Sequence, residues 1–297
     1  MEPERYEYLY ELGSSHLPIS KKLIINVALT GNVHTKEDTP FLPITPEEIA
    51  ADVKKCFEAG ARVFHIHARE SDGSCTWKKE AFEEIFSKVR KQVPGAILCA
   101  TTSGRVYRDF EQRAEVLALE GELKPDFASL TLGSLNFPKS ASVNSPETIF
   151  RLAGLMREKG IKPELEVFET GMINYAVYMR RKGHLESPMF FNLILGNLGS
   201  MPARMADICH MVGSIPPGSC WGAGAAGRFQ LPTNAAAVLM GGHVRVGLED
   251  NIYMDYGKSE LATNESLVQR VVRIAGEVGR PIATPDEARE ILGLGGR

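Results

Sequence analysis

The chain has 297 residues, of which 43% are hydrophobic and 24% are charged, and its formal net charge is −3. This composition is that of an ordinary globular protein, and the slight acidity disfavours a nucleic-acid-binding surface, which needs clustered positive charge. The five cysteines are scattered without C-x-x-C spacing, and the first residues lack the apolar core of a signal peptide. No apolar run reaches the ~20 residues of a membrane helix. We therefore expect a cytoplasmic protein that binds neither membranes nor nucleic acids.

Strand-like and helical segments alternate along the chain after about the first 20 residues. The expected strands are short apolar runs, and helices begin at Ser/Thr-Pro pairs such as Thr45-Pro46, which suit an N-cap and a first helical turn. Strands are expected at 22–30, 61–68, 96–102, 126–133, 163–169, 189–196, 218–225 and 243–250. Helices are expected at 45–60, 78–92, 110–119, 145–160, 172–183, 202–214, 231–242, 260–277 and 284–294.

Eight successive strand–helix units predict a closed parallel sheet, the (β/α)8 or TIM barrel of the α/β class. We expect a single barrel domain over residues 22–297, with residues 1–21 as an N-terminal extension and 284–294 as an extra C-terminal helix. An open doubly wound sheet is the alternative. GAGAAG at 222–227 fits a dinucleotide-binding pattern, but too little chain follows it to build a Rossmann domain. Its glycines instead predict a loop that lets the backbone approach a ligand, such as a phosphate-bearing cosubstrate.

Two histidines, His65 and His67, lie two residues apart in the second expected strand. They therefore leave the same face, and active sites of barrels lie at the C-terminal ends of strands. A single strand histidine is more commonly a hydrogen-bonded core residue than a metal ligand, and for this pair both interpretations stay open. Glu249 at the end of the eighth strand can complete a set of two histidines and a glutamate, which is the pattern of a catalytic zinc site.

Other charged residues occupy inward positions of the expected strands. Arg245 shares a face with Glu249, and Asp250 follows as the chain enters a loop. Glu164 and Glu166 share one face of the fifth strand, where a buried glutamate needs a cation nearby. We expect Glu164 at the exposed lower rim and Glu166 inside. The third and fourth strands end in TTSGR and SLTLGS, which can bind a small carboxylate or simply form turns.

Several motifs together resemble the β-keto acid cleavage enzymes over about residues 22–294. They are TGNVHTKEDTPFLPITPEEIA, FEAGARVFHIHARE, SLNF, PELEVFETGM and GGHVRVGLEDN. Members of that family are zinc-dependent (β/α)8 barrels that use acetyl-CoA to convert a β-keto acid into acetoacetate and a new acyl-CoA. The resemblance implies zinc on His65, His67 and Glu249, acetyl-CoA as cosubstrate, and a homo-oligomer, specifically a homotetramer.

The resemblance also implies roles for other residues. Arg245 and Asp250 match a dyad that removes a proton from C2 of the keto acid, and Glu166 matches a carboxylate near that dyad. The resulting enolate attacks the acetyl thioester, and the CoA thiolate then cleaves the adduct in a retro-Claisen exchange, with zinc as Lewis acid. The substrate carboxylate is expected at Thr101, Gly104, Ser129 and Thr131.

One departure from the family bears on the substrate. In the family's type member, a glutamate near the end of the first strand contacts the substrate's amino group, and Val33 occupies that position here. A cationic substrate would lose its partner, so we expect a β-keto acid with a neutral, apolar or hydroxylated tail. His34 can donate or accept a hydrogen bond with a hydroxylated tail. Thr101 and Thr131 replace a serine and an asparagine, and both keep a hydroxyl donor.

Two other functions remain compatible with the residues. A zinc-dependent hydrolase of the amidohydrolase kind also has H-x-H in a barrel, but on the first strand and with histidines on strands five and six. PELEVF and MFFNLIL contain none. A non-catalytic zinc- or CoA-binding barrel is the other alternative, and the set of Arg245, Asp250 and Glu166 disfavours it.

Overall fold

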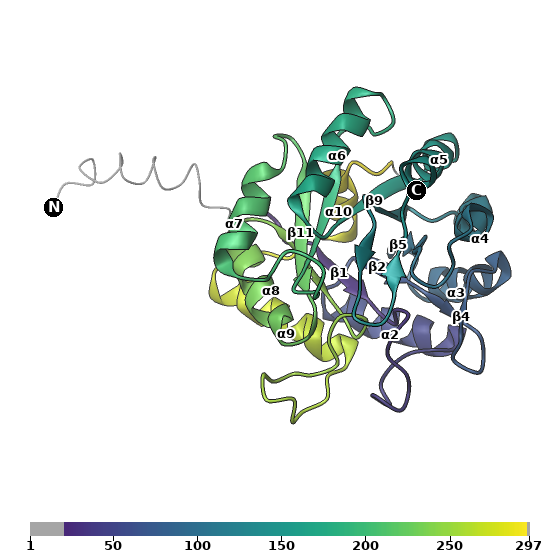
Figure 1. Cartoon of the computed structure of the whole chain (residues 1–297). Coiled ribbons are helices and arrows are strands. Elements are labelled where there is room, and N and C mark those ends of the chain that lie inside the picture. Colours follow the sequence, from purple (N-terminus) through teal and green to yellow (C-terminus); the bar gives the residue numbers. More distant parts are fainter. Residues whose placement is uncertain (1–20, 296–297) are drawn as a thin grey trace, which may run out of the picture.

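A computed structural model describes residues 21–295, so nearly all of the expected extension at 1–21 lies outside the described residues. Eight parallel strands close into a barrel in the order β1-β12-β11-β10-β9-β6-β5-β2, surrounded by helices (Figure 1). The predicted (β/α)8 barrel is confirmed, and the alternative of an open sheet is wrong. The division into an extension and one domain stays a prediction.

The barrel strands lie where the apolar runs predict them. They are β1 (Ile25–Ala28), β2 (Val63–Ile66), β5 (Ile97–Ala100), β6 (Phe127–Thr131), β9 (Lys162–Val167), β10 (Phe190–Leu195), β11 (Cys220–Ala225) and β12 (His243–Val246). Two small antiparallel hairpins lie in the loops that follow β2 and β6. They pair β3 (Ala68–Arg69) with β4 (Cys75–Thr76), and β7 (Leu135–Asn136) with β8 (Ala141–Ser142).

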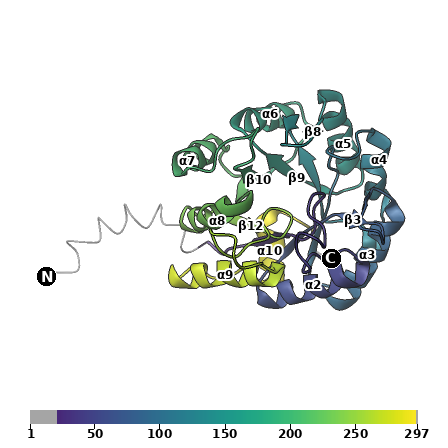
Figure 2. The same ribbon diagram turned by 60° about the horizontal axis from the view of Figure 1, so that its bottom comes forward.

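Helices alternate with the strands and surround them, with α10 near the middle of the ring in Figure 2. They are α2 (Pro46–Ala59), α3 (Lys79–Gln92), α4 (Phe110–Ala114), α5 (Pro146–Glu158), α6 (Thr170–Arg181), α7 (Met205–Ser214), α8 (Gln230–Leu239), α9 (Asn264–Glu277) and α10 (Pro285–Leu292). Short 3-10 turns are η2 (Glu115–Ala118), η3 (Gly121–Leu123) and η4 (Gly227–Phe229). Along residues 21–295, no helix has both the length and the apolar composition needed to cross a membrane.

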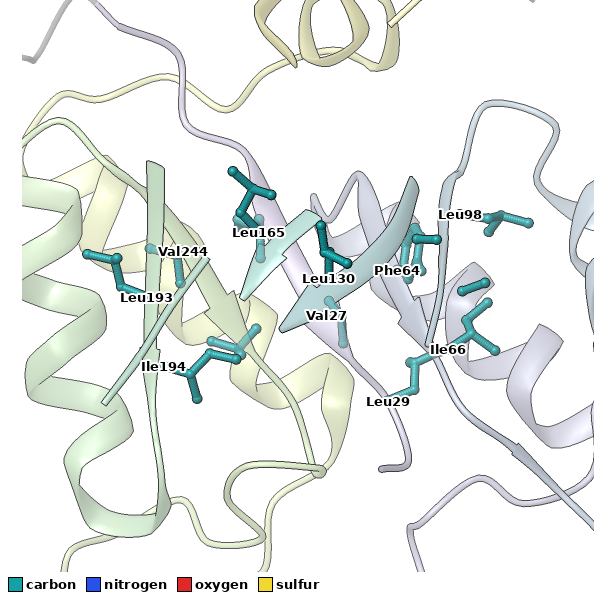
Figure 3. Packing of buried hydrophobic residues seen from close by; sticks show 14 of the residues in the cluster. Val27, Leu29, Phe64, Ile66, Leu98, Leu130, Leu165, Leu193, Ile194 and Val244 are labelled. Atoms are coloured by element: carbon teal, nitrogen blue, oxygen red, sulfur yellow. The ribbon is translucent and has the colours of Figure 1, made fainter. Parts of the chain in front are cut away.

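Side chains on the strands alternate between two cores. Outward-facing residues such as Val27, Phe64 and Leu165 belong to the large core between sheet and helices (Figure 3). Inward-facing residues near the N-terminal strand ends form a second cluster with residues of α10, which we call the lower core. It contains Ile24, Val63, Ile97, Cys99, Phe127, Phe190, Ala283, Ala288 and Leu292. Because the lower core is apolar, the polar interior residues concentrate above it.

The last barrel strand ends earlier than its pattern predicts. β12 stops at Val246, because Gly247 has a φ of 135°, where an added Cβ would lie 2.0 Å from the carbonyl oxygen of Ala28. Only glycine is accommodated there. The turn lets both Glu249 and Asp250 line the cavity above the barrel, whereas a continuing strand would direct only one of them inward.

Candidate functional site

A cavity of about 280 Å³ lies at the C-terminal ends of the barrel strands. Acidic and basic side chains, hydroxyls and apolar groups all line it. The sequence-predicted residues among them are Val33, His34, His67, Thr101, Thr131, Glu166, Arg245, Glu249 and Asp250. Since they come from six different strand–loop units, the cavity exists only in the closed barrel.

His65, His67 and Glu249 converge at the base of this cavity. The two Nε2 atoms are 3.2 Å apart, and Glu249 Oε1 lies 3.5 Å from Nε2 of His67. Glu249 Oε2 lies 3.9 Å from Nε2 of His65. An added Cβ on Gly31 would lie 2.4 Å from Cγ of Glu249, so the loop after β1 packs tightly against this glutamate. The structure thus brings together the three predicted metal ligands.

The second ring nitrogen of each histidine has an oxygen partner. Nδ1 of His65 lies 3.0 Å from Oε2 of Glu164, and Nδ1 of His67 lies 2.8 Å from Oδ1 of Asn32. These acceptors favour a proton on each Nδ1, which leaves a lone pair on each Nε2. Burial also lowers the pKa of His67 and favours its neutral form. Neither partner was predicted from the sequence, since Glu164 was expected at an exposed rim and Asn32 was not singled out.

Glu164 does not lie at an exposed rim, and that expectation was wrong. Its side chain is fully buried, because β9 begins at Lys162 and places Glu164 beside Ser129 of β6. Oε1 of Glu164 accepts hydrogen bonds from Nδ2 of Asn26 (2.6 Å) and Nδ2 of Asn192 (3.1 Å). The two asparagines at inward positions of apolar strands were the sequence signal that could have revealed it.

The carboxylate of Glu164 is held in its ionised form. Burial raises its pKa, but the hydrogen bond from His65 and the charge of Arg245 outweigh burial and leave the pKa below its usual value. Sγ of Cys99 also donates to Oε2, at 3.2 Å. Glu164 therefore fixes the orientation of His65 from below.

Arg245 is buried among three carboxylates. Its Nε donates to Oδ2 of Asp250 at 2.7 Å, and its Nη2 lies 3.2 Å from Oε1 of Glu249. Nη1 lies 3.8 Å from Oε1 of Glu166, whose Oε2 accepts a hydrogen bond of 2.7 Å from Thr131. The predicted dyad is thus in direct contact, with Glu166 beside it.

The two carboxyl groups that flank Arg245 are poised to take up protons. Burial raises the pKa of Asp250, whereas the positive charge of Arg245 lowers it and the negative charge of Glu249 raises it again. The net result is a pKa above its usual value. Burial also raises the pKa of Glu166. A carboxylate with a raised pKa is a better general base near neutral pH.

The residues present fit a divalent cation. Glu166, Glu249 and Asp250 lie around the guanidinium of Arg245, so negative charge is in excess there. Oε2 of Glu249 is buried and has no hydrogen-bond partner within residues 21–295. Such an orphaned oxygen is costly. Two imidazole nitrogens, a carboxylate oxygen and an adjoining cavity are the donor set of a catalytic zinc site.

Of the four residues expected to bind the substrate carboxylate, only two line the cavity. Thr101 and Thr131 line the cavity, whereas Gly104 and Ser129 do not. The hydroxyl of Ser129 accepts a hydrogen bond of 3.1 Å from the backbone of Thr102. An added Cβ on Gly104 would lie 2.6 Å from the carbonyl oxygen of Val143. Ser129 and Gly104 therefore shape the loop that carries Thr101.

The glycines of GAGAAG belong to barrel packing. Gly222 and Gly224 lie in β11, and an added Cβ on Gly224 would lie 2.8 Å from the carbonyl oxygen of Arg245. The small residue makes room for the arginine. The closed barrel agrees with the conclusion from the sequence that this motif does not belong to a dinucleotide-binding domain. Ala226, in the same motif, lines the cavity.

Fold and site together define a class: a (β/α)8 barrel with a His-His-Glu cluster and an Arg–Asp pair facing one cavity. The family model for beta-keto acid cleavage enzymes matches residues 22–294. The chain belongs to the β-keto acid cleavage enzyme family. The hydrolase and the non-catalytic barrel are thereby set aside.

Curated relatives span nearly the full length of the chain. The 3-keto-5-aminohexanoate cleavage enzyme of Acetoanaerobium sticklandii is 42% identical over 275 residues, which are 92% of this chain and 99% of the relative. The 3-oxoadipate:acetyl-CoA acetyltransferase of Cupriavidus necator is 36% identical over 280 residues, 93% and 96% of the two chains. A solved ternary complex of ObcA with a C4-CoA adduct and oxalate has a TM-score of 0.77 at 22% identity, covers 86% of this chain and 68% of that chain, and shows the shared fold.

Proposed function

We propose that the protein condenses a β-keto acid with acetyl-CoA in a zinc-dependent reaction that yields acetoacetate and a new acyl-CoA. The observation that carries this proposal is that His67 and Glu249 of the His65–His67–Glu249 cluster line the same cavity as Arg245 and Asp250. Names of relatives support it, since the Cupriavidus necator protein is an acetyl-CoA acetyltransferase acting on 3-oxoadipate.

The metal cluster and the base have separate roles in this proposal. His65, His67 and Glu249 hold the ion, which when bound supplies Lewis-acid charge for the keto oxygen. Asp250 removes the proton from C2 of the keto acid. Arg245 orients Asp250 and places positive charge where the negative charge of the enolate develops. Glu166, fixed by Thr131, holds Arg245 from its other side.

Two successive bond exchanges then complete the reaction. The C2 carbanion attacks the acetyl carbonyl, and the C–S bond breaks to release the CoA thiolate. The thiolate adds to the C3 ketone of the original substrate, and the C2–C3 bond breaks. Asp250 returns the proton to C2, so acetoacetate leaves with C1 and C2 of the substrate, and the tail leaves as its acyl-CoA.

The walls of the cavity support a substrate without a positively charged tail. We propose that Thr101 and Thr131 donate to the substrate carboxylate, and that Gly104 and Ser129 keep the surrounding loop in place. Val33 lines the cavity where a carboxylate would be needed for an amino group. The apolar residues Leu135, Phe137, Phe168 and Ile194 line it as well. A neutral, apolar or hydroxylated tail fits this surface.

The test is acetoacetate formation from acetyl-CoA and a panel of β-keto acids: β-ketohexanoate, 5-hydroxy-β-ketohexanoate, β-ketoadipate and a 5-amino compound. We expect turnover of the neutral acids by the zinc-loaded protein and none by His65→Ala. A preference for the amino compound would refute the role of Val33 and leave the chemistry standing. No turnover of any acid would refute the proposed reaction.

We also propose that the enzyme acts in the cytoplasm as a homo-oligomer, specifically a homotetramer, as the family resemblance implies. Light scattering of the purified full-length chain measures the mass directly. A mass of one chain, independent of protein concentration, would contradict the oligomer.

A further inference from the structure

Arg105 is a basic residue in the cavity wall that the proposed reaction does not use. It follows β5 in the loop beyond Thr101 and lines the cavity together with Lys139. Within residues 21–295, its guanidinium has neither an ion-pair partner nor a hydrogen-bond acceptor. Five N–H donors of a half-buried cation are therefore left for a ligand or for water.

The neighbouring buried arginines are satisfied by protein oxygens. Arg69 donates to the carbonyl oxygen of Gly31 at 3.0 Å and 2.6 Å. Arg113 donates to the carbonyl oxygen of Thr102 at 2.8 Å and to Oδ1 of Asn144 at 2.7 Å. Arg105 differs from both, since the protein places it in the wall without supplying an acceptor.

An aromatic ring holds Arg105 in place. The central carbon of its guanidinium lies 4.0 Å from the centroid of the Phe137 ring, a stacking contact that limits the orientation of the planar group. Phe137 and Lys139 both belong to the connection between β7 and β8. The loop after β5 and the hairpin after β6 thus bring two positive charges to the outer part of the cavity, beyond the strand ends.

We propose that Arg105, assisted by Lys139, forms an anion subsite at the mouth of the cavity for a carboxylate or phosphate group of one of the two substrates. A guanidinium binds either group through two parallel hydrogen bonds. The inference rests on the proposed function, since that function supplies the anions. They are the phosphates of acetyl-CoA and, on a dicarboxylic β-keto acid, the second carboxylate. A neutral tail leaves the phosphates as the occupant.

The test compares Arg105→Gln with Arg108→Gln, a matched control on the same loop whose side chain is exposed and does not line the cavity. Calorimetry measures binding of acetyl-CoA and of β-ketoadipate, each added alone so that no turnover is needed. We expect Arg105→Gln to weaken binding of one of them by about 10- to 100-fold, Lys139→Gln by a few-fold, and Arg108→Gln to have no effect.

Truncated ligands identify which anion occupies the subsite. Loss of affinity for acetyl-CoA but not for S-acetylpantetheine, which has no phosphate, assigns the subsite to the cosubstrate. Loss for β-ketoadipate but not for β-ketohexanoate assigns it to the substrate tail. Unchanged affinity for all four ligands, or equal losses in the Arg105 and Arg108 variants, would overturn the subsite. Binding without any acetoacetate formation would instead refute the reaction and not the subsite.

Discussion

The lower and upper halves of the barrel interior are built from the same strands and differ in chemistry. β2 contributes Val63 to the lower core and His65 to the cluster above it, and β9 rises from Lys162 to the buried Glu164. Below, aromatic and aliphatic side chains pack against α10. Above, charged groups are held by hydrogen bonds and ion pairs. Depth along a strand therefore decides whether an inward residue serves stability or chemistry.

The largest effect is expected from Asp250→Asn, which keeps the shape of the side chain and removes the proposed base. We expect kcat to fall by about 10²- to 10⁴-fold, the usual contribution of a general base. The free energy of unfolding should change little, because Nε of Arg245 can still donate to the amide oxygen. Steady-state kinetics and urea unfolding measure the two quantities. An unchanged kcat would assign proton removal to another residue.

Phe127→Ala in the lower core is expected to have the opposite effect to Asp250→Asn: it should lower stability and leave the site above intact. The ring of Phe127 is fully buried, with its centroid 5.8 Å from that of Phe190. Its removal leaves a cavity and should cost about 3–5 kcal/mol of unfolding free energy. Urea unfolding measures the loss, while metal content per folded chain should stay constant. A drop in metal content under native conditions would show that the two halves are not independent.

A pH effect tests the lower half of the interior at His243. Burial first, and then the charges of Arg280 and Lys21, lower its pKa to about 3, and its Nδ1 accepts a hydrogen bond from the backbone of Ile24 at 3.1 Å. The folded state thus binds this proton less readily than the unfolded state. Stability from His243 is complete above the unfolded pKa of ~6.5 and is lost as pH falls toward 3, by about 2 kcal/mol at pH 5.

His243→Asn is the matched variant for this effect, because its amide oxygen can accept the same hydrogen bond and does not titrate. Urea unfolding of both proteins between pH 8 and pH 5 gives the comparison. We expect the wild-type chain to lose more stability over this interval than the variant. Parallel curves for the two proteins would contradict a neutral, buried His243.

The smallest effect is expected from Glu164→Gln, which keeps the size of the side chain but weakens the acceptor for Nδ1 of His65. Loss of such an oxygen partner typically lowers metal affinity by about 10- to 100-fold. Competition with a chromophoric chelator measures the affinity. Glu169→Gln, at the exposed N-cap of α6, is the control and should leave it unchanged. Equal affinities in wild type and Glu164→Gln would show that Glu164 does not position His65.

The order of elements and the candidate ligand and dyad residues were predictable from the sequence, because apolar runs and Thr-Pro caps mark the units and the two-residue period sets the face of each side chain. The depth of a side chain along the barrel interior was not predictable, since it depends on the register between neighbouring strands. Glu164 was therefore placed at a rim, whereas its pairing with Ser129 buries it. Asp250 reaches the cavity because of the turn at Gly247, which no strand period encodes.

Closure of the barrel between β1 and β12 also has a consequence for assembly. The histidines come from β2, the second barrel strand to leave the ribosome, whereas Glu249 follows β12, the last one, and β1 lies between these two strands in the sheet. A nascent chain that still lacks β12 has only the two imidazoles of the cluster. Formation of the three-residue set therefore coincides with completion of the cylinder, and uptake of the proposed ion would report that step.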